Sequence, residues 1–490
     1  MTDLTQLTLS EGLARLASGD LTSTQWTQAY LDAINNHDET LNAYITVLAD
    51  DALAQAQAAD DALASGPSDD QPLLGVPLAI KDVLSTKGVQ TTCASKILEG
   101  YKPVFDATSV ARLKAAGAVI LGKLNCDEFA MGSSNENSAY GPVRNPWDVE
   151  RVPGGSSGGS GAAVAAELCA AALGTDTGGS VRLPASFCGI TALKPSYGRI
   201  SRYGLIAYGS SLDCVGPMAR SVEDVARLLQ VMAGHDPLDS TTMPADVPDY
   251  LADLQQDVTG MKIGIPAEYF TDAIDDDVKQ LVEAAVQQME DLGAEIVHIS
   301  MPHTEYCLAA YYIIATSEAS SNLARFDGVR YGPRADRGEM WDTYRATRGL
   351  FGPEVKRRIM LGTYALSAGY YDAYYGKAQQ VRTLIKQDFD QALKKVDAIM
   401  TPVAPSTAPK LGENVSDPLQ LYLFDVMSVS ANLAGVPALA FPVGFTGAGL
   451  PVAAQVFTRQ YDESSALRVG HAYQQATDWH TRRAPLVAGR

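Results

Sequence analysis

The chain has 490 residues, of which 46% are hydrophobic and 19% are charged, a composition typical of a folded globular protein. It excludes disordered, collagen-like and coiled-coil classes, and the length suggests about three domains or one large sheet-based domain. The 57 acidic residues outnumber the 38 basic residues and give a net charge of −19. This is the wrong sign for a chain that binds a nucleic-acid backbone by itself, so we expect a partner to hold any nucleic acid.

The sequence also restricts location and metal binding. No run of about 18 apolar residues marks a membrane span, and residues 1–10 lack the features of a signal peptide. We therefore expect a cytoplasmic protein without membrane contact. The 6 cysteines lack Cys-x-x-Cys spacing and the 6 histidines form no HExxH pair, so we expect buried thiols and no metal site.

The N-terminal segment, residues 1–65, is expected to be helical. Thr22 and Gln25 have the spacing of a capping box, and apolar residues from Trp26 to Ile34 repeat at helical spacing. A second, alanine-rich helix is expected over residues 48–64. The polar stretch 65–71, with its Gly and Pro, then predicts a loop.

From residue 76 onward, helix and strand patterns alternate, which is typical of an α/β fold. Apolar runs predict buried strands, and longer periodic stretches predict the helices between them. Strands are expected at 76–80, 118–121, 262–265, 295–299, 398–400, 438–443 and 452–457. Helices are expected at 109–116, 162–172 and 277–292, with a connector at 235–250.

The most unusual stretch is the glycine and serine segment 153–161. Backbone N–H groups that precede a helix can hold negative charge, but no lysine completes a P-loop and no GxGxxG pattern occurs. A flexible linker is a second reading. Residues 155–159 also match GxSxG, in which Ser157 would be the nucleophile of an α/β-hydrolase if a strand preceded it.

A second glycine-containing turn follows at residues 174–184. Gly178 and Gly179 allow the backbone to turn tightly, so that consecutive N–H groups can converge on one oxygen beside Ser180. Acyl transfer needs this geometry, and a structural turn with a capping serine is the alternative.

A serine nucleophile needs a base, and none of the six histidines lies in either glycine-containing segment. Lys81 comes directly after the apolar run 76–80, at the end of an expected buried strand. Loss of hydration lowers the pKa of a lysine and makes its amine a usable base. The alternatives are a lysine that reaches water and a histidine that the fold brings to the site.

The stretches around these residues resemble the amidase signature family. They are GVPLAIKD at 75–82, PGGSSGGSGAAVAA at 153–166 and GTDTGGSVRLPASFCGITALKP at 174–195. The resemblance implies an α/β fold in which helices cover both faces of a large mixed β-sheet. Because the motifs must converge on one site, we expect a single amidase domain over residues 1–490, with the helical segment 1–65 packed on it.

The resemblance also implies a catalytic triad. In the family, a lysine, a serine held by a cis peptide and a second serine act together, and these roles fall on Lys81, Ser156 and Ser180. Neutral Lys81 would take a proton from Ser156, which takes one from Ser180 as it attacks an amide carbonyl. The implied oxyanion donors are the backbone N–H groups of Thr177, Gly178, Gly179 and Ser180, and the implied supporting residues are Ser157, Asp176 and Arg182.

Three further stretches, 127–137, 318–332 and 355–362, resemble the glutaminase subunits of tRNA-dependent amidotransferases. A free amino acid is a zwitterion, so its pocket needs a guanidinium for the carboxylate and an acid for the ammonium. The resemblance gives these roles to Arg358 and Asp425. Without it, both residues are typical of a solvated surface. The implied pocket-lining residues are Met131 and Tyr311, the latter next to Tyr312.

The resemblance further implies partners. This chain would release ammonia from glutamine within a heterotrimer whose other subunits are B and C. ATP and magnesium are expected on a partner, which would activate Glu-tRNA(Gln) or Asp-tRNA(Asn), and no cofactor is expected in this chain. Two alternatives stay open: a freestanding amidase of the same family, and an α/β-hydrolase esterase that uses Ser157 and a distant histidine.

Overall fold

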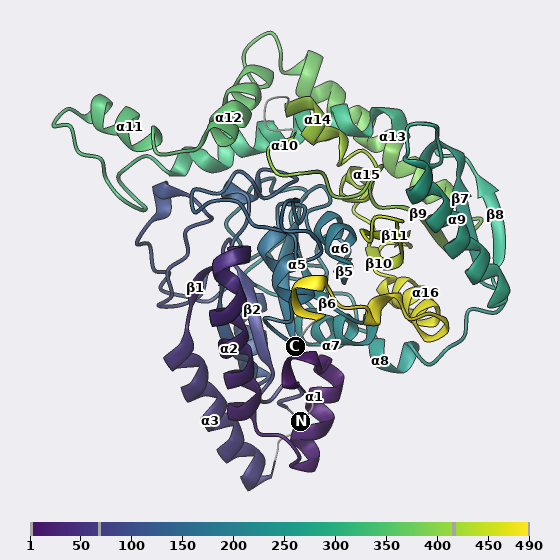
Figure 1. Cartoon of the computed structure of the whole chain (residues 1–490). Helices are drawn as coiled ribbons and strands as arrows, with labels where there is room; N and C mark the ends of the chain where they lie inside the picture. Colours follow the sequence, from purple (N-terminus) through teal and green to yellow (C-terminus); the bar gives the residue numbers. More distant parts are fainter. Residues whose placement is uncertain (1–2, 67–69, 414–417, 489–490) are drawn as a thin grey trace.

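A computed structural model describes residues 3–66, 70–413 and 418–488, and its centre is a sheet of 11 strands (Figure 1). The spatial order of the strands is β1-β3-β2-β4-β6-β5-β10-β11-β9-β7-β8. Their bounds are β1 Tyr44–Val47, β2 Pro77–Lys81, β3 Val119–Leu124, β4 Ala171–Asp176, β5 Thr191–Lys194, β6 Cys214–Ala219, β7 Lys262–Pro266, β8 Glu295–Ile299, β9 Ala398–Pro402, β10 Ala438–Phe445 and β11 Pro451–Phe457.

Parallel and antiparallel pairs both occur in this sheet. β2 is parallel to β3 and β4, and β7 is parallel to β8 and β9. The strands between β4 and β9 are all antiparallel to their neighbours, as is β1 to β3. With helices on both faces, this mixed sheet confirms the predicted fold class.

The helices differ widely in length and surround the sheet (Figure 1). Their bounds are α1 Leu9–Ser18, α2 Ser23–Leu41, α3 Ala49–Ser65, α4 Thr108–Ala115, α5 Gly158–Ala165, α6 Arg182–Cys188, α7 Val222–Met232, α8 Tyr250–Asp253, α9 Asp276–Asp291, α10 Cys307–Asn322, α11 Met340–Arg348, α12 Pro353–Ala365, α13 Lys377–Ala392, α14 Pro418–Leu423, α15 Val429–Ala434, α16 Glu463–Ala476 and α17 Pro485–Ala488. None of the helices in the described ranges is both long enough and apolar enough to cross a membrane.

The N-terminal helices form as expected. Thr22 and Gln25 exchange side-chain to backbone hydrogen bonds at the start of α2, which is the predicted capping box. Trp26 and Tyr30 on the same helix are fully buried. The sequence did not predict β1, whose four residues add an antiparallel edge strand beside β3.

The helix expected over residues 162–172 is wrong in its second half. α5 ends at Ala165, Glu167 adopts a left-handed conformation with φ of 56°, and residues 171–176 form β4. Every residue of β4 is buried between its neighbours β2 and β6. Alanine suits a helix, but it also suits a central strand that is covered on both faces, and a short apolar run does not separate the two.

The other expected elements appear within a few residues of their expected bounds. The β7-α9-β8 unit, for example, is a parallel strand pair with a helix between, as the alternating pattern predicted. In the expected loop 65–71, residues 67–69 lie outside the described residues. The expected connector 235–250 contains no helix or strand before Tyr250, where α8 begins.

One hydrophobic cluster extends from Leu7 near the N-terminus to Val487 near the C-terminus. It includes residues of the N-terminal helices and residues of the sheet, and α3 packs against β3. That the whole chain forms a single domain stays a prediction, and this shared core supports it.

Candidate active site

Lys81 is the last residue of β2 and is fully buried. Because β2 and β4 are parallel neighbours, their C-terminal ends meet at the same edge of the sheet. The Lys81 ammonium therefore reaches Thr175 on β4, with 2.9 Å between Nζ and Oγ1. Nζ also lies 2.8 Å from Oγ of Ser156 and 2.8 Å from Oγ of Ser157.

Burial lowers the pKa of Lys81 from its ordinary value to about 8. The carboxylates of Asp127, Asp176 and Asp213 favour the charged form and limit this shift. At this pKa about a tenth of the amine is neutral at pH 7, far more than for an ordinary lysine, and a general base must be neutral. The alternative of a lysine that reaches water is therefore wrong.

Ser156 is held in place by the loop around Asp127. The peptide bond between Gly155 and Ser156 is cis, and the carbonyl of Ser156 accepts a hydrogen bond from the N–H of Asp127. A Cβ atom on Gly155 would lie 2.1 Å from a carboxylate oxygen of Asp127. Only glycine fits beside this carboxylate, which explains one of the glycines in the segment.

Ser180 ends the turn that follows β4, and it is 8% exposed, more than the fully buried Lys81 and Ser156. The N–H of Ser157 donates to the carbonyl of Ser180 at 3.2 Å, which joins the two serine segments. Among the described residues, Oγ of Ser180 has no hydrogen bond to Oγ of Ser156. The structure thus brings Lys81 and Ser156 into direct contact and places Ser180 beside them.

The turn at Gly178 and Gly179 differs in one respect from the expected oxyanion site. The N–H of Gly179 donates to Oδ1 of Asp176 at 2.8 Å and is therefore engaged. The N–H groups of Thr177, Gly178 and Ser180 make no hydrogen bond to the described part of the chain. These three groups stay as predicted oxyanion donors, and Gly179 contributes its left-handed backbone, with φ of 135°.

Asp176 and Arg182 form a fully buried ion pair that fixes this turn. Two nitrogens of Arg182, Nε and Nη2, lie 3.1 Å from the two carboxylate oxygens of Asp176, a bidentate arrangement. The guanidinium holds the pKa of Asp176 at about 2, although burial alone would raise it. The remaining donors of Arg182 bind the Ser428 carbonyl and the side chains of Asn432 and Gln455. The predicted supporting position of both residues fits this geometry.

Arg358 is buried on α12, whereas the basic run around it is typical of a solvated face. Its Nε donates to Oε1 of Glu354 at 2.7 Å, and its Nη1 donates to the hydroxyl of Tyr208 at 2.7 Å. Its guanidinium also lies over the rings of Tyr208, Tyr312 and Tyr422, within 5.6 Å of each centroid. The solvated-face reading of Arg358 is wrong.

Asp425 follows α14 and is also buried, so its reading as a surface acid is wrong too. Its carboxylate accepts hydrogen bonds from the hydroxyls of Ser133, at 2.8 Å, and Tyr312, at 2.7 Å. Burial raises its pKa to about 6, while these hydrogen bonds and Arg358 oppose the shift. An acid of this kind is mostly ionised near neutral pH and can bind an ammonium group.

Tyr311 and Tyr312 of α10 divide their contacts between the two parts of the site. Tyr312 binds Asp425, whereas the ring of Tyr311 lies against Gly178, where a Cβ would be 2.5 Å from Cζ of Tyr311. Both tyrosines therefore contact the site, and the sequence singled out only the first. Met131 is fully buried directly after the short 3-10 helix Glu128–Ala130.

Several residues with direct contacts in the site were not singled out from the sequence. They include Ser133, Thr175, Tyr208, Tyr312, Glu354, Tyr422, Ser428, Asn432 and Gln455. Glu354 stands four residues before Arg358 on one helix, which is a readable ion-pair spacing. The others gave no local signal beyond their nearness to a motif, because their partners are distant in the sequence.

Comparison with known proteins decides the family. The family model described as Amidase matches residues 25–467. The chain belongs to the amidase family. It is therefore an amidase, and the alternative of an α/β-hydrolase esterase is wrong. The structure agrees, because no strand precedes Ser157 in residues 152–156 and its hydroxyl is buried beside Lys81.

Individual relatives are similar over nearly the whole chain. A Roseiflexus protein, named as the A subunit of glutamyl-tRNA(Gln) amidotransferase, is 58% identical over 487 residues, 99% of each chain. A protein of the same name from Geobacter metallireducens is 56% identical over 99% of this chain and 100% of its own. The crystal structure of the protein of that name from Thermotoga maritima has 42% identity and a TM-score of 0.81, covering 97% of this chain and 96% of its own.

Proposed function

We propose that this amidase is the glutaminase subunit of a tRNA-dependent amidotransferase. It would hydrolyse glutamine and supply the ammonia that converts Glu-tRNA(Gln) to Gln-tRNA(Gln), and the same ammonia could serve Asp-tRNA(Asn). The observation that carries the proposal is the buried, hydrogen-bonded pair of Lys81 and Ser156, together with the buried Arg358 and Asp425, which both contact Tyr312. The names of relatives that match over 99% of the chain support the Glu-tRNA(Gln) acceptor.

The proposed reaction begins with the neutral amine of Lys81. Its two N–H groups point to Ser157 and Thr175, 2.8 and 2.9 Å away, which leaves the lone pair for the hydroxyl proton of Ser156. Ser156 in turn takes the proton of Ser180 as Oγ of Ser180 attacks the amide carbon of glutamine. Reversal of the relay delivers a proton to the departing ammonia, and a water then hydrolyses the glutamyl ester on Ser180 by the same path.

The tetrahedral intermediate carries a negative oxygen, which the turn after β4 would stabilise. The free N–H groups of Thr177, Gly178 and Ser180 are the proposed donors, and the loss of one such donor costs on the order of 3 kcal/mol of barrier. The ion pair of Asp176 and Arg182 keeps the turn in this shape before substrate arrives.

Glutamine would be recognised by its two charges. Arg358 would bind the α-carboxylate and Asp425 the α-ammonium, with Tyr311 and Met131 lining the pocket. The Oγ of Ser428 donates to the carbonyl of Gly178 and to that of Asp425, so the ammonium site and the oxyanion turn share one contact. A bound amino acid would thus be positioned relative to Ser180.

The remaining components would come from partners. We assign ATP, magnesium and the tRNA to partner subunits B and C in a heterotrimer, and we place the complex in the cytoplasm. The net charge of −19 on this chain fits that division, because a strongly acidic chain does not attract a phosphate backbone.

The decisive experiment is Ser180→Ala in the complex reconstituted with its partners. Glutamine-dependent amidation of Glu-tRNA(Gln) should fall by about 10⁴-fold, while free ammonium should still support amidation. Ser160→Ala is the matched control, because Ser160 is also buried and, among the described residues, its hydroxyl donates to the Leu173 carbonyl and touches no catalytic group. Loss of the ammonium-supported reaction in Ser180→Ala would contradict a glutaminase role. Rapid hydrolysis of simple amides by the isolated chain would instead favour a freestanding amidase.

A further inference from the structure

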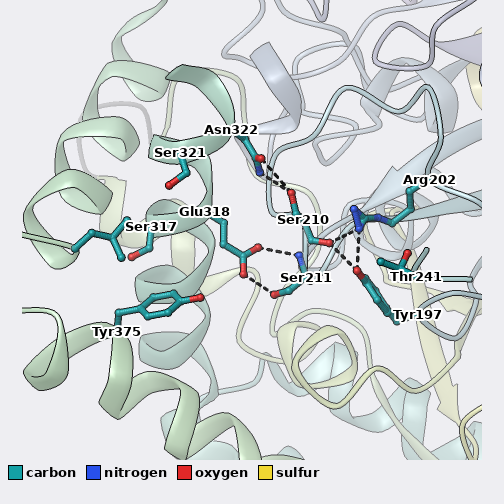
Figure 2. Close-up of a pocket in the computed structure, with 11 residues that line it drawn as sticks. Tyr197, Arg202, Ser210, Ser211, Thr241, Ser317, Glu318, Ser321, Asn322 and Tyr375 are labelled. Atoms are coloured by element: carbon teal, nitrogen blue, oxygen red, sulfur yellow. Dashed lines mark hydrogen bonds between the residues drawn. The ribbon is translucent and has the colours of Figure 1, made fainter. Parts of the chain in front are cut away.

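A cavity of about 510 Å³ lies between the segment before β6 and the C-terminal half of α10 (Figure 2). This volume suits a small organic molecule. It is lined by Tyr197, Arg202, Ser210, Ser211, Thr241, Ser317, Glu318, Ser321, Asn322, Leu366 and Tyr375. The lining is unusual in that it contains one carboxylate, one guanidinium, many hydroxyl groups and a single aliphatic side chain.

The carboxylate of Glu318 stands on one side of this cavity. Its two oxygens accept hydrogen bonds from the N–H and the hydroxyl of Ser211, at 2.8 and 2.6 Å. Each oxygen keeps a second lone pair for a further donor. In Figure 2 the hydroxyl of Tyr375 points toward Glu318 from the side of the cavity away from Arg202.

The guanidinium of Arg202 stands on the other side, and only part of it is used. Its Nη1 donates to the hydroxyl of Tyr197 and to the carbonyl of Ser210. Its Nε is buried and has no hydrogen-bond partner within the described residues, and the same holds for the hydroxyl of Ser317. A buried polar group without a partner is costly, by about 1–3 kcal/mol, so each of these groups calls for an acceptor or donor.

We propose that this cavity is an accessory binding site for a small zwitterion that carries both a carboxylate and an ammonium group. The Nε and Nη2 edge of Arg202 presents two parallel N–H groups, the geometry that binds a carboxylate in a bidentate manner. Glu318 takes the ammonium, and the hydroxyls of Ser317 and Tyr375 satisfy the remaining polar atoms. The site shares no residue with the catalytic groups described above.

The segment that contributes Ser210 and Ser211 to this cavity also contacts the active site on both sides of these serines. Ser210 and Ser211 line the cavity, while the residues on either side of them contact the proposed machinery. Tyr208 accepts the hydrogen bond from Arg358, and Asp213 accepts one from the hydroxyl of Thr177 at 2.7 Å. A ligand that fixes Ser210 and Ser211 therefore changes the glutamine site. This coupling rests on the proposed function, whereas binding itself does not.

The test is calorimetric titration of the full chain with 4-aminobutanoate, and with butanoate and butylamine, each of which lacks one of its charges. We expect saturable binding of 4-aminobutanoate, and at least about tenfold weaker binding of each single-charge analogue, because every tenfold step in affinity needs only one modest contact. Equal affinity for all three compounds, or no saturable binding of 4-aminobutanoate, would overturn the proposal.

Two variants test the site by different means. Arg202→Gln removes the carboxylate-binding edge, and Ser321→Phe fills the cavity from an exposed position on α10. Both should abolish binding of 4-aminobutanoate. Arg468→Gln is the matched control, because Arg468 is likewise partly buried and donates to a backbone carbonyl, that of Asp257. Retained binding in Ser321→Phe would place the ligand elsewhere and overturn the proposed site.

The coupling between this cavity and the glutamine site is measured separately. Saturating 4-aminobutanoate should change KM for glutamine by about fivefold or more in the unmodified chain, and not in Ser321→Phe. An unchanged KM in the presence of bound 4-aminobutanoate would overturn the coupling. Binding of 4-aminobutanoate by a chain that fails to hydrolyse glutamine would contradict the proposed function alone.

Discussion

Two regions of the site are built in different ways. The first region contains the lysine and serine groups around Lys81, and the second region contains Arg358 and Asp425. Lys81 and Asp176 end two neighbouring parallel strands, so the sheet itself fixes their positions. Arg358 and Asp425 come from α12 and from the turn after α14, in the helical layer above the sheet (Figure 1). Sheet hydrogen bonds hold the first region, whereas ring packing and side-chain hydrogen bonds hold the second.

This difference separates chemistry from recognition. The first region contains the groups that would move protons, and the second contains the charges that would bind the ends of an amino acid. The two regions are linked by the hydrogen bond from Ser428 to Gly178 and by the packing of Tyr311 against Gly178. Substitutions in the first region should therefore lower kcat, and substitutions in the second should raise KM.

The largest effect is expected for Lys81→Met, which keeps the stem and removes the base. The value of kcat should fall by about 10²–10⁴-fold, the range of general base catalysis. In the unmodified chain, kcat should rise with pH and level off above about 8, because the pKa of Lys81 is lowered to that value and only the neutral amine accepts a proton. A pH profile in single-turnover assays checks this. A profile that stays flat below that pH would remove Lys81 as the base.

The next effect concerns stability. Asp176→Asn removes the charge that faces Arg182 and leaves a buried guanidinium unpaired, which should lower the free energy of unfolding by about 3–5 kcal/mol. Urea denaturation measures this change. The control is Asp148→Asn, which removes a partly exposed pair with Arg151 and should cost less than about 1 kcal/mol. Equal effects of the two variants would show that the buried pair has no special structural role.

The first region could be predicted from sequence more fully than the second. The strand-end lysine and the glycine turns are local patterns, and Lys81 and Ser156 do meet at 2.8 Å. Arg358 was not predictable from its neighbours, because it packs against Tyr208, 150 residues earlier in the chain. Spacing along a helix carries no information on a contact of that range.

Two errors inside the first region also have physical reasons. The alanine run was expected to continue as a helix, but residues 171–176 pair with β2 and β6 inside the sheet and are buried on both faces, where small apolar residues also fit. The N–H of Gly179 was expected to face the oxyanion, but Asp176 accepts it at 2.8 Å. Which of several adjacent N–H groups stays free depends on a side chain whose direction the sequence does not reveal.

A smaller effect is expected in the recognition region. Arg358→Gln should raise KM for glutamine by about 10–100-fold with little change in kcat, because it removes one charge-assisted pair from the bound substrate. Steady-state kinetics with glutamine measures both constants. Arg357→Gln is the control, since Arg357 also pairs with Glu354 but is largely exposed. A fall in kcat as large as the rise in KM would break the separation between the two regions.

The pH dependence of KM for glutamine tests the binding role of Asp425 in the second region. Asp425 must be ionised to bind an ammonium group, and its pKa is raised to about 6 by burial. KM should therefore be constant above this pH and should rise as the pH falls through it. Asp425→Asn should give a high KM that no longer varies in this range. The same rise in KM below that pH in Asp425→Asn would assign the ionisation to another group.

The smallest effect is expected for Ser157→Ala. This variant distinguishes the effect of Ser157 on the orientation of the Lys81 amine from its effect on the pKa of Lys81. The Ser157 hydroxyl donates to the Thr175 carbonyl at 3.1 Å, so toward Lys81 it acts only as an acceptor. Its loss removes a contact that favours the charged amine, so the pKa of Lys81 should fall below about 8. The pH profile should shift toward acid, while the plateau of kcat drops by about tenfold at most because the lone pair is less well directed. Ser160→Ala should change neither, and a shift toward alkaline pH in Ser157→Ala would mean that Ser157 acts as a donor to Lys81.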